Sequence, residues 1–409
     1  MRRAAAPVLA LLMVFTQSGG PVVADHGGRD IGSFMACDRP VDPPRCTSVG
    51  DNLVHFVAFD EELRPDLAAA IRASMAEDYD APTRLRLVEQ DEVRPSTDVI
   101  AFSGDYGDNG AAGWVYCPTD APQGINRMGD RWCRHQELHL NHNARYGLFF
   151  DDEASRGHIA CHELGHTLGL RHWGNPPQTD GPIGATCMNA NTPNGPTTLH
   201  PTDIDHLNDY PFRIHPRPHG VRIVRATDDP VVFASGAVGS LEALETGEAT
   251  TLRELIADSD AVVHGRITAV ALGRVFGPAN RPLHYASAVV AVTEVLHGAL
   301  PPRATSLTLE IPLFDGPGAI DRLRAGMAGT ERILFVRNKG ASAADAGMSA
   351  DEQAADAGFY RLVSFAAEIV DVAGSAVVAE AEHELLTPLA RLSFERALQV
   401  VRRAAAASD

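Results

Sequence analysis

The first half of the chain mixes short apolar runs with one longer run of helical periodicity. Three strands are predicted from apolar or alternating runs, at residues 53–59, 84–90 and 98–104. Residues 64–79 carry apolar side chains at helical spacing, so a helix is expected there. Residues 137–143 alternate polar and apolar side chains, which is typical of an edge strand. The segment 200–212 predicts a short helix that opens with a proline and stops before Pro211.

The second half has a different pattern, in which valine-rich runs are separated by Gly/Pro turns. The runs cover residues 261–270, 285–296, 305–311, 332–338 and 359–365. Such spacing favours a mostly-β domain, either a small barrel or a sandwich. Thr251 and Glu254 stand at capping-box spacing and predict a short helix. A second helix is expected at 393–403, and the acidic, small-residue insert 340–358 is expected to be a mobile loop.

The N-terminus predicts a signal peptide. Arg2 and Arg3 precede an apolar run at residues 4–15 that is too short to span a bilayer, and small residues at 22–24 fit a cleavage site. A buried N-terminal helix is the alternative. No later apolar run reaches the ~18 residues that a membrane helix needs. We therefore expect a secreted, extracellular protein with no membrane anchor, and the near absence of lysine is typical of a GC-rich bacterial genome.

The expected signal peptide, the change of pattern between the two halves and the prolines at 216 and 218 divide the chain into four parts. They are a signal peptide at 1–24, a first domain at 25–216, a linker at 217–247 and a β-rich domain of unknown role at 248–409. The length of 409 residues fits two domains.

Charge and cysteine content narrow the partners and the compartment. A formal net charge of −18 argues against nucleic acid and anionic membranes as partners. Six cysteines in an exported chain predict disulfides. Short loop closure favours three pairs, Cys37–Cys46, Cys117–Cys133 and Cys161–Cys187, although six cysteines allow about 15 connectivities. The sequence carries no signal of oligomeric state.

Histidines are concentrated between Gly157 and Trp173, on a predicted helix. His162 and His166 lie four residues apart, so both imidazoles can reach one metal ion from the same helix face. Glu163 points about 100° away around the helix, where it can approach a water on the metal. His158 is too distant along the axis, about 12 Å from His166, to share the ion. The better third ligand is His172, which follows a glycine at 169 where the helix can end.

These residues together resemble the metzincin clan of zinc endopeptidases, and most closely its small secreted bacterial members. The long clan motif HExxHxxGxxH matches His162, Glu163, His166, Gly169 and His172. Met188 stands sixteen residues after His172, which suits the clan's Met-turn. The resemblance implies an α/β (α+β) catalytic domain over residues 50–212, with a twisted mixed sheet and an active-site helix. It also implies that a Cys161–Cys187 bond would tie that helix to the Met-turn.

Two positions depart from the clan pattern. Trp173 matches none of the residues that follow the motif in the best-known families, and no tyrosine stands two residues after Met188. Transition-state stabilisation would then come from the metal and a backbone donor. Clan substrates lie antiparallel along an upper edge strand, and residues 137–141 are expected to be that edge.

The resemblance implies a peptidase that uses one catalytic Zn²⁺. Three neutral imidazoles leave the ion an open position, where the pKa of a bound water falls toward about 7. Glu163 would act as the general base, and the partner would be a protein or peptide substrate. One alternative is a catalytically silent binding or adhesion protein on the same scaffold, although binding alone needs no base. Another is a zinc hydrolase of a non-peptide bond, for which no sugar or phosphate signature exists.

Three further patterns have residues typical of binding sites. Asp105, Asp108 and Asn109 could bind Ca²⁺, but the segment lacks the loop and terminal Glu of an EF-hand, so a turn is favoured. A second zinc site from the histidines at 135, 139 and 142 is disfavoured against exposed loop and strand histidines. Cys46 lies in a segment similar to the matrixin cysteine switch, but threonine replaces its glycine, which favours the Cys37–Cys46 disulfide.

Overall fold

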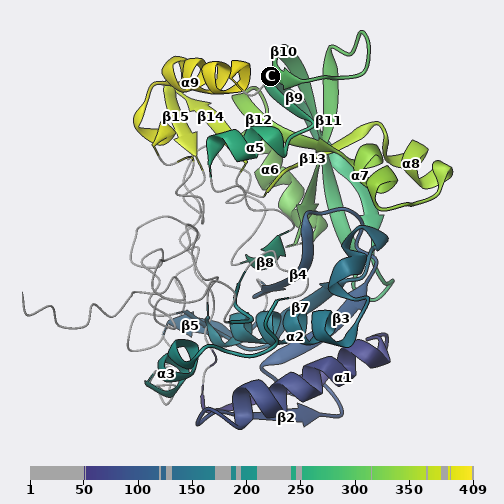
Figure 1. Cartoon of the computed structure of the whole chain (residues 1–409), viewed down its shortest axis with the longest axis vertical. Helices are drawn as coiled ribbons and strands as arrows, with labels where there is room; N and C mark the ends of the chain where they lie inside the picture. Colours follow the sequence, from purple (N-terminus) through teal and green to yellow (C-terminus); the bar gives the residue numbers. More distant parts are fainter. Residues whose placement is uncertain are drawn as a thin grey trace, which may run out of the picture.

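The computed structural model is a mixed α/β structure with two large sheets (Figure 1). It describes residues 50, 52–118, 121–125, 131–170, 186–189, 195–209, 241–245, 251–314, 316–364, 367–378, 386 and 388–407. The expected signal peptide, the Cys37–Cys46 pair and His172 lie outside the described residues.

The first sheet has the strand order β2-β1-β3-β7-β4-β8. Its strands are β1 (Val54–Phe59), β2 (Arg86–Gln90), β3 (Val99–Gly104), β4 (Ala111–Tyr116), β7 (Gln136–Asn141) and β8 (Leu241–Glu245). β1 pairs in parallel with β2 and with β3, and β3 pairs in parallel with β7. β4 runs antiparallel to β7, and β8 runs antiparallel to β4.

This topology corrects two expectations. Residues 137–141 belong to an interior strand, because β7 is paired with β3 on one side and β4 on the other. Their polar face is buried: the imidazole of His139 stacks on Trp114, 4.8 Å between ring centroids, and its Nε2 lies 3.0 Å from Glu137 Oε2. Residues 241–245 are a strand of the first sheet, although they fall within the segment expected to be a linker.

Helices α1 (Pro65–Ser74) and α2 (Glu153–Leu168) pack against each other, and α2 also contacts β4 and β7. The helix predicted at 64–79 continues beyond α1 as a π-helical segment, Met75–Asp80. The apolar residues Leu67, Ile71, Ile159 and Leu164 are fully buried in this core. A 3₁₀ helix, Ala144–Phe149, precedes α2, and α3 (Pro201–Asp209) coincides with the predicted short helix.

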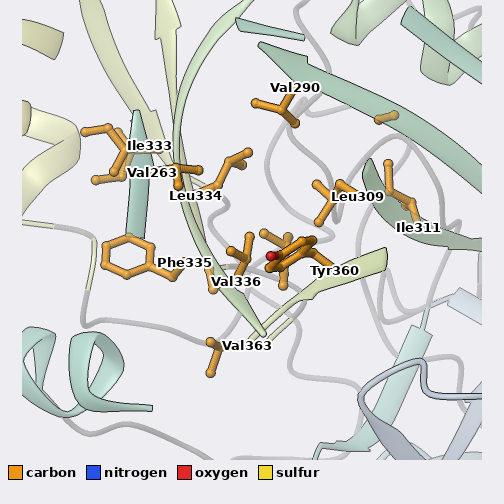
Figure 2. Close-up of a cluster of buried hydrophobic side chains, with 14 of the residues drawn as sticks. Val263, Val290, Leu309, Ile311, Ile333, Leu334, Phe335, Val336, Tyr360 and Val363 are labelled. Carbon is orange, nitrogen blue, oxygen red and sulfur yellow. The ribbon is translucent and has the colours of Figure 1, made fainter. Parts of the chain in front are cut away.

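The second sheet has the strand order β13-β11-β10-β9-β12-β14-β15. Its strands are β9 (Ala261–Phe276), β10 (Leu283–Gly298), β11 (Ser306–Leu313), β12 (Glu331–Asn338), β13 (Phe359–Leu362), β14 (Glu368–Val372) and β15 (Ser375–Val378). Because β13 pairs with both β11 and β12, five of the strands form a closed ring. Figure 2 shows part of the buried apolar cluster of this half, in which Val263, Val290, Leu309 and Phe335 are all fully buried.

Helices α5 (Leu252–Ala257), α6 (Ile320–Met327) and α9 (Phe394–Ala406) accompany the second sheet. α5 begins with the capping box that Thr251 and Glu254 predict. The insert 340–358 is not a loop, since it contains α7 (Lys339–Asp345) and α8 (Ala350–Asp356). Alanine has the highest helix propensity, and a second capping box, Ser349 with Glu352, starts α8.

The two halves of the chain share a buried interface. Tyr106 and Trp114 of the first half belong to the apolar cluster of the second, where the Trp114 ring lies 5.5 Å from that of Phe314. Tyr285 donates a hydrogen bond to the carbonyl of Tyr106 at 2.8 Å. The second half of the chain is thus packed directly on β4 and on the loop that precedes it.

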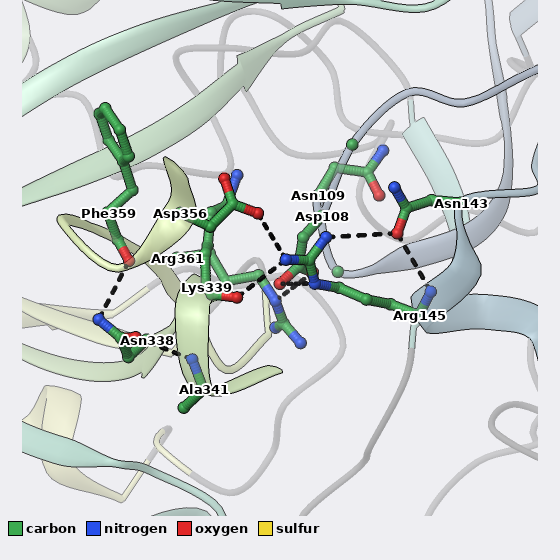
Figure 3. Close-up of polar contacts among 12 residues, drawn as sticks. Asp108, Asn109, Asn143, Arg145, Asn338, Lys339, Ala341, Asp356, Phe359 and Arg361 are labelled. Carbon is green, nitrogen blue, oxygen red and sulfur yellow. Dashed lines mark hydrogen bonds and ion pairs between the residues drawn. The ribbon is translucent and has the colours of Figure 1, made fainter. Parts of the chain in front are cut away.

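A buried polar network completes this interface (Figure 3). Asp108 accepts a hydrogen bond from Arg361 Nε at 2.7 Å, across the two halves. Arg145 pairs with Asp356 at 2.5 Å and donates to the carbonyl of Lys339 at 2.9 Å. Charges buried this deeply are stabilised only when paired and hydrogen-bonded, which these are.

Among the described residues the structure has the disulfides Cys117–Cys133 and Cys161–Cys187, and both pairings agree with those expected from spacing. The first joins the end of β4 to the small hairpin of β5 (Gln123–Ile125) and β6 (Arg131–Cys133). Within the described ranges, no helix has the length and apolarity needed to cross a bilayer.

Candidate functional site

The site is built on the C-terminal half of α2. Asp152 caps the start of the helix by accepting a hydrogen bond from the amide of Ser155 at 2.7 Å. Gly169 ends it in the left-handed conformation, with φ of 99°, and the amide of Leu170 then donates to Gly165 O at 2.9 Å. The helix therefore ends three residues after His166, as the glycine in the sequence predicts.

His162 and His166 project from consecutive turns and are both fully buried. Their Nε2 atoms face each other at 2.9 Å. His162 Nδ1 lies 2.7 Å from Cys187 O, and His166 Nδ1 lies 2.8 Å from Leu170 O. A carbonyl oxygen only accepts, so each Nδ1 carries a hydrogen and donates it to the backbone, which leaves the two Nε2 atoms turned toward each other.

This arrangement fits a cation between the two rings. Two Nε2 atoms this close share a cation, which can be a hydrogen-bonded proton or a metal ion. Backbone carbonyls that hold the Nδ1 hydrogens fix the tautomer and ring orientation, as they do behind metal-binding imidazoles. The two histidines therefore have the donor chemistry and orientation of ligands to one divalent metal.

Glu163 lies on the neighbouring face of α2, against β4. Its carboxylate is fully buried and packs on Gly113, where a Cβ atom would stand only 2.5 Å from Glu163 Oε1. The carboxylate thus occupies the space that any other residue at 113 would fill. Gly113 was not identified from the sequence, and a glycine between alanines and Trp114 is its one local signal.

The turn at Cys187–Met188 lies beneath the histidines. Met188 is fully buried, and its sulfur packs against Gly165, which lies between the two histidines on α2. The Cys161–Cys187 disulfide ties this turn to the helix one residue before His162. The carbonyl of Cys187 is the acceptor for His162, so the same turn both supports and orients the imidazole.

Two further contacts hold the support in place. Thr186 Oγ1 donates to Asp203 Oδ2 at 2.7 Å and accepts from the amide of Met188 at 3.1 Å, which links the turn to α3. Tyr79 donates its phenol hydrogen to Cys161 O at 2.5 Å. Burial raises the pKa of Tyr79 well above its ordinary value of 10.0, so the phenol stays a donor. Tyr79 is remote in sequence, and no local pattern identifies it.

His158 lies outside the pair. Its Nδ1 is 2.6 Å from the carbonyl of Pro196, and its ring centroid is 6.0 Å from that of His162. Burial lowers its pKa, so the ring is neutral at neutral pH. His172, the expected third ligand, lies outside the described residues, and within those residues no group of three His, Cys, Asp or Glu side chains could hold a metal.

The residues of the possible calcium site and of the possible second zinc site bond to other protein groups and do not converge on an ion. Asp108 is bonded to Arg361, Asn109 accepts from the amide of Ala111 at 2.9 Å, and Asp105 accepts from Gly107 N at 2.9 Å. His139 is held by Glu137 and Tyr106. His135 Nε2 lies 2.9 Å from Arg94 O, far from any shared centre with His139.

Comparison with known proteins gives little further guidance. No protein-family model and no curated protein sequence matches the chain. Among solved structures, one match is to High choriolytic enzyme 1, a hatching enzyme zinc-protease from Oryzias latipes (Medaka fish). The identity is 17%, over 33% of this chain and 53% of that chain, with a TM-score of 0.19. The chain thus spans about half the length of that enzyme, and so low a score lends no weight to an assignment.

Proposed function

We propose that the protein is a zinc-dependent endopeptidase whose site is formed by His162, His166, His172 and Glu163. The observation that carries the proposal is the pair of Nε2 atoms, 2.9 Å apart, with both Nδ1 atoms fixed by backbone carbonyls. His172 completes the ligand set by its spacing after Gly169. Zinc bound there would supply a Lewis acid and an activated water.

The chain's own residues have distinct roles in this reaction. The imidazoles would bind the zinc ion, and the carbonyls of Cys187 and Leu170 orient the rings of His162 and His166. The Glu163 carboxylate is the proton acceptor, and it then delivers the proton to the leaving amine. Its position against Gly113 places it beside the backbone of β4. A peptide that pairs with β4 would therefore present its scissile bond next to this carboxylate.

The test separates metal binding from catalysis. Purified mature protein should contain one zinc per chain by elemental analysis and should hydrolyse casein or a peptide library. His162→Ala and His172→Ala should each lose zinc and activity. Glu163→Gln should keep its zinc and lose activity by at least about a hundredfold, the usual contribution of a general base.

The matched control is His158→Gln, since this buried histidine lies one turn before His162 but bonds to Pro196. It should retain its zinc. Zinc that persists in His172→Ala would contradict the ligand set. Zinc-loaded protein that cleaves no peptide would favour the binding-protein alternative.

The site also fits a wider proposal for the chain. We propose that residues 1–24 direct export and are removed, that 25–216 carry the catalytic domain and that 248–409 are a supporting domain. The two disulfides support an oxidising compartment. N-terminal sequencing of the protein recovered from culture medium should begin near residue 25.

A further inference from the structure

Strand β8 occupies the sheet edge that borders the candidate site. The first sheet ends in β2 on one side and in β8 on the other. Only the β8 end lies beside the carboxylate of Glu163, because Glu163 packs on Gly113 of β4. β8 pairs with β4 along its length and also lies against α2 (Figure 1).

The register places β8 at the level of the candidate base. Leu244 is the partner of Gly113, and Ala243 is the partner of Trp114. The backbone around 243–244 therefore runs beside the part of β4 against which Glu163 is packed. An extended peptide that adds to β4 as an antiparallel strand would need this same row of backbone donors and acceptors.

We infer that β8 is an intramolecular inhibitory strand, which must leave β4 before a peptide substrate can bind. This inference rests on the proposed function. Because β8 belongs to the same chain, it meets β4 at an effective concentration that is about millimolar for short connections. A substrate at micromolar concentration competes poorly with β8. Its apparent affinity is its intrinsic affinity multiplied by the fraction of molecules in which β8 is displaced.

The test removes the pairing without touching the site. Ala243→Pro deletes a backbone N–H and disfavours the strand, whereas the matched control Ala243→Val keeps the N–H and favours it. A second variant replaces residues 241–245 by Gly-Ser-Gly-Ser-Gly, in case the proline prevents folding. The probe is a fluorescent peptide with the sequence of residues 239–247, GSLEALETG.

Two measurements do not depend on catalysis. Deuterium uptake by the β4 segment 111–116 should rise in Ala243→Pro and in the Gly-Ser variant, while uptake by β3 stays low. The probe peptide should bind both variants at least about tenfold more tightly than it binds wild type or Ala243→Val. Equal binding to all four proteins, or rapid exchange of β4 already in wild type, would overturn the inference.

The kinetic readout distinguishes this inference from the proposed function. Displacing a competing strand should lower KM for a peptide substrate at least about tenfold and leave kcat unchanged. Hydrolysis with the same KM in wild type and Ala243→Pro would leave the peptidase proposal standing and overturn the inhibitory strand. Tighter probe binding without hydrolysis in any zinc-loaded protein would support the strand's role and overturn the peptidase.

Discussion

Replacing Asp108 by asparagine tests the buried contact between the two halves of the chain. The Asp108 side chain is 1% exposed and accepts from Arg361 Nε at 2.7 Å and from Tyr146 OH at 2.9 Å. Burial alone would raise its pKa, but Arg361, Lys339 and Arg145 together lower it from 3.8 to about 2. Asn keeps the shape of the side chain and removes its charge.

The magnitude follows from that shift. A pKa that falls from 3.8 in the unfolded state to about 2 in the folded state corresponds to roughly 2–3 kcal/mol of stability at neutral pH. Leaving Arg361 buried without its counter-charge adds to the loss, since breaking such pairs costs about 3–5 kcal/mol. We therefore expect Asp108→Asn to lower the free energy of unfolding by about 3 kcal/mol at pH 7.

The pH dependence has a defined sign. Because the folded-state pKa is depressed, the stabilisation is complete above the unfolded value near 4 and is lost as pH falls toward about 2. Urea unfolding at a series of pH values should show the wild-type and variant curves converging below pH 4. The control Asp321→Asn removes an exposed pair with Arg324 and should change stability by no more than about 0.5 kcal/mol.

A loss smaller than about 1 kcal/mol at pH 7 would refute the reasoning, because a desolvated charge would then have no consequence. A loss that stays constant from pH 7 to pH 3 would refute the assignment of the effect to the Asp108 charge.

Two other changes have predictable outcomes. Burial, with the nearby charge of Glu77, raises the pKa of Asp78 from 3.8 to about 6, so the folded state holds this proton more tightly and stability falls as pH rises through that window. At pH values above 6, Asp78→Asn should therefore raise the urea midpoint and increase the free energy of unfolding by up to about 3 kcal/mol. At pH values below 4 it should have little effect on either quantity. Replacing Cys161 and Cys187 by serine opens a loop with a sequence separation of 26, which costs about 3.5 kcal/mol in the chain-entropy model. It should also weaken zinc binding measured by competition with a chelator, because Cys187 O orients His162.

Each of these two predictions has an outcome that would contradict it. Asp78→Asn that destabilises at pH 7 would contradict the raised pKa. Removing the Cys117–Cys133 disulfide, with a separation of 16, should cost a similar amount, about 3 kcal/mol, and leave zinc affinity unchanged. Equal loss of zinc affinity in both double variants would contradict the role of the Cys187 carbonyl.

The helix that carries the site was predictable because its signals are local. The histidine spacing, the glycine at 169 and the following turn are all contained in a short segment, and the structure places His162 and His166 face to face. The cysteines at 161 and 187 stand next to candidate site residues, so their pairing could also be expected from spacing.

The strands beside the site could not be predicted in the same way. β4 begins with two alanines and Gly113, which have low β propensity, and it becomes a strand through its pairing with β7. β8 pairs with β4 across more than a hundred residues, and local composition alone gave it the character of a linker. The alternation of β7 resembled an exposed edge because the partners that bury Glu137 and His139 are remote in sequence.

One consequence concerns where the molecule can be divided. β4 contributes Val115 to the core around α2 and Trp114 to the core of the second domain, so a single strand serves two interiors. A fragment that ends at the change in composition near residue 216 would keep every candidate zinc ligand and yet leave one face of that strand in water. The candidate site and the carboxy-terminal half are therefore expected to unfold together, and neither half is a self-sufficient piece for dissection or for transfer to another protein.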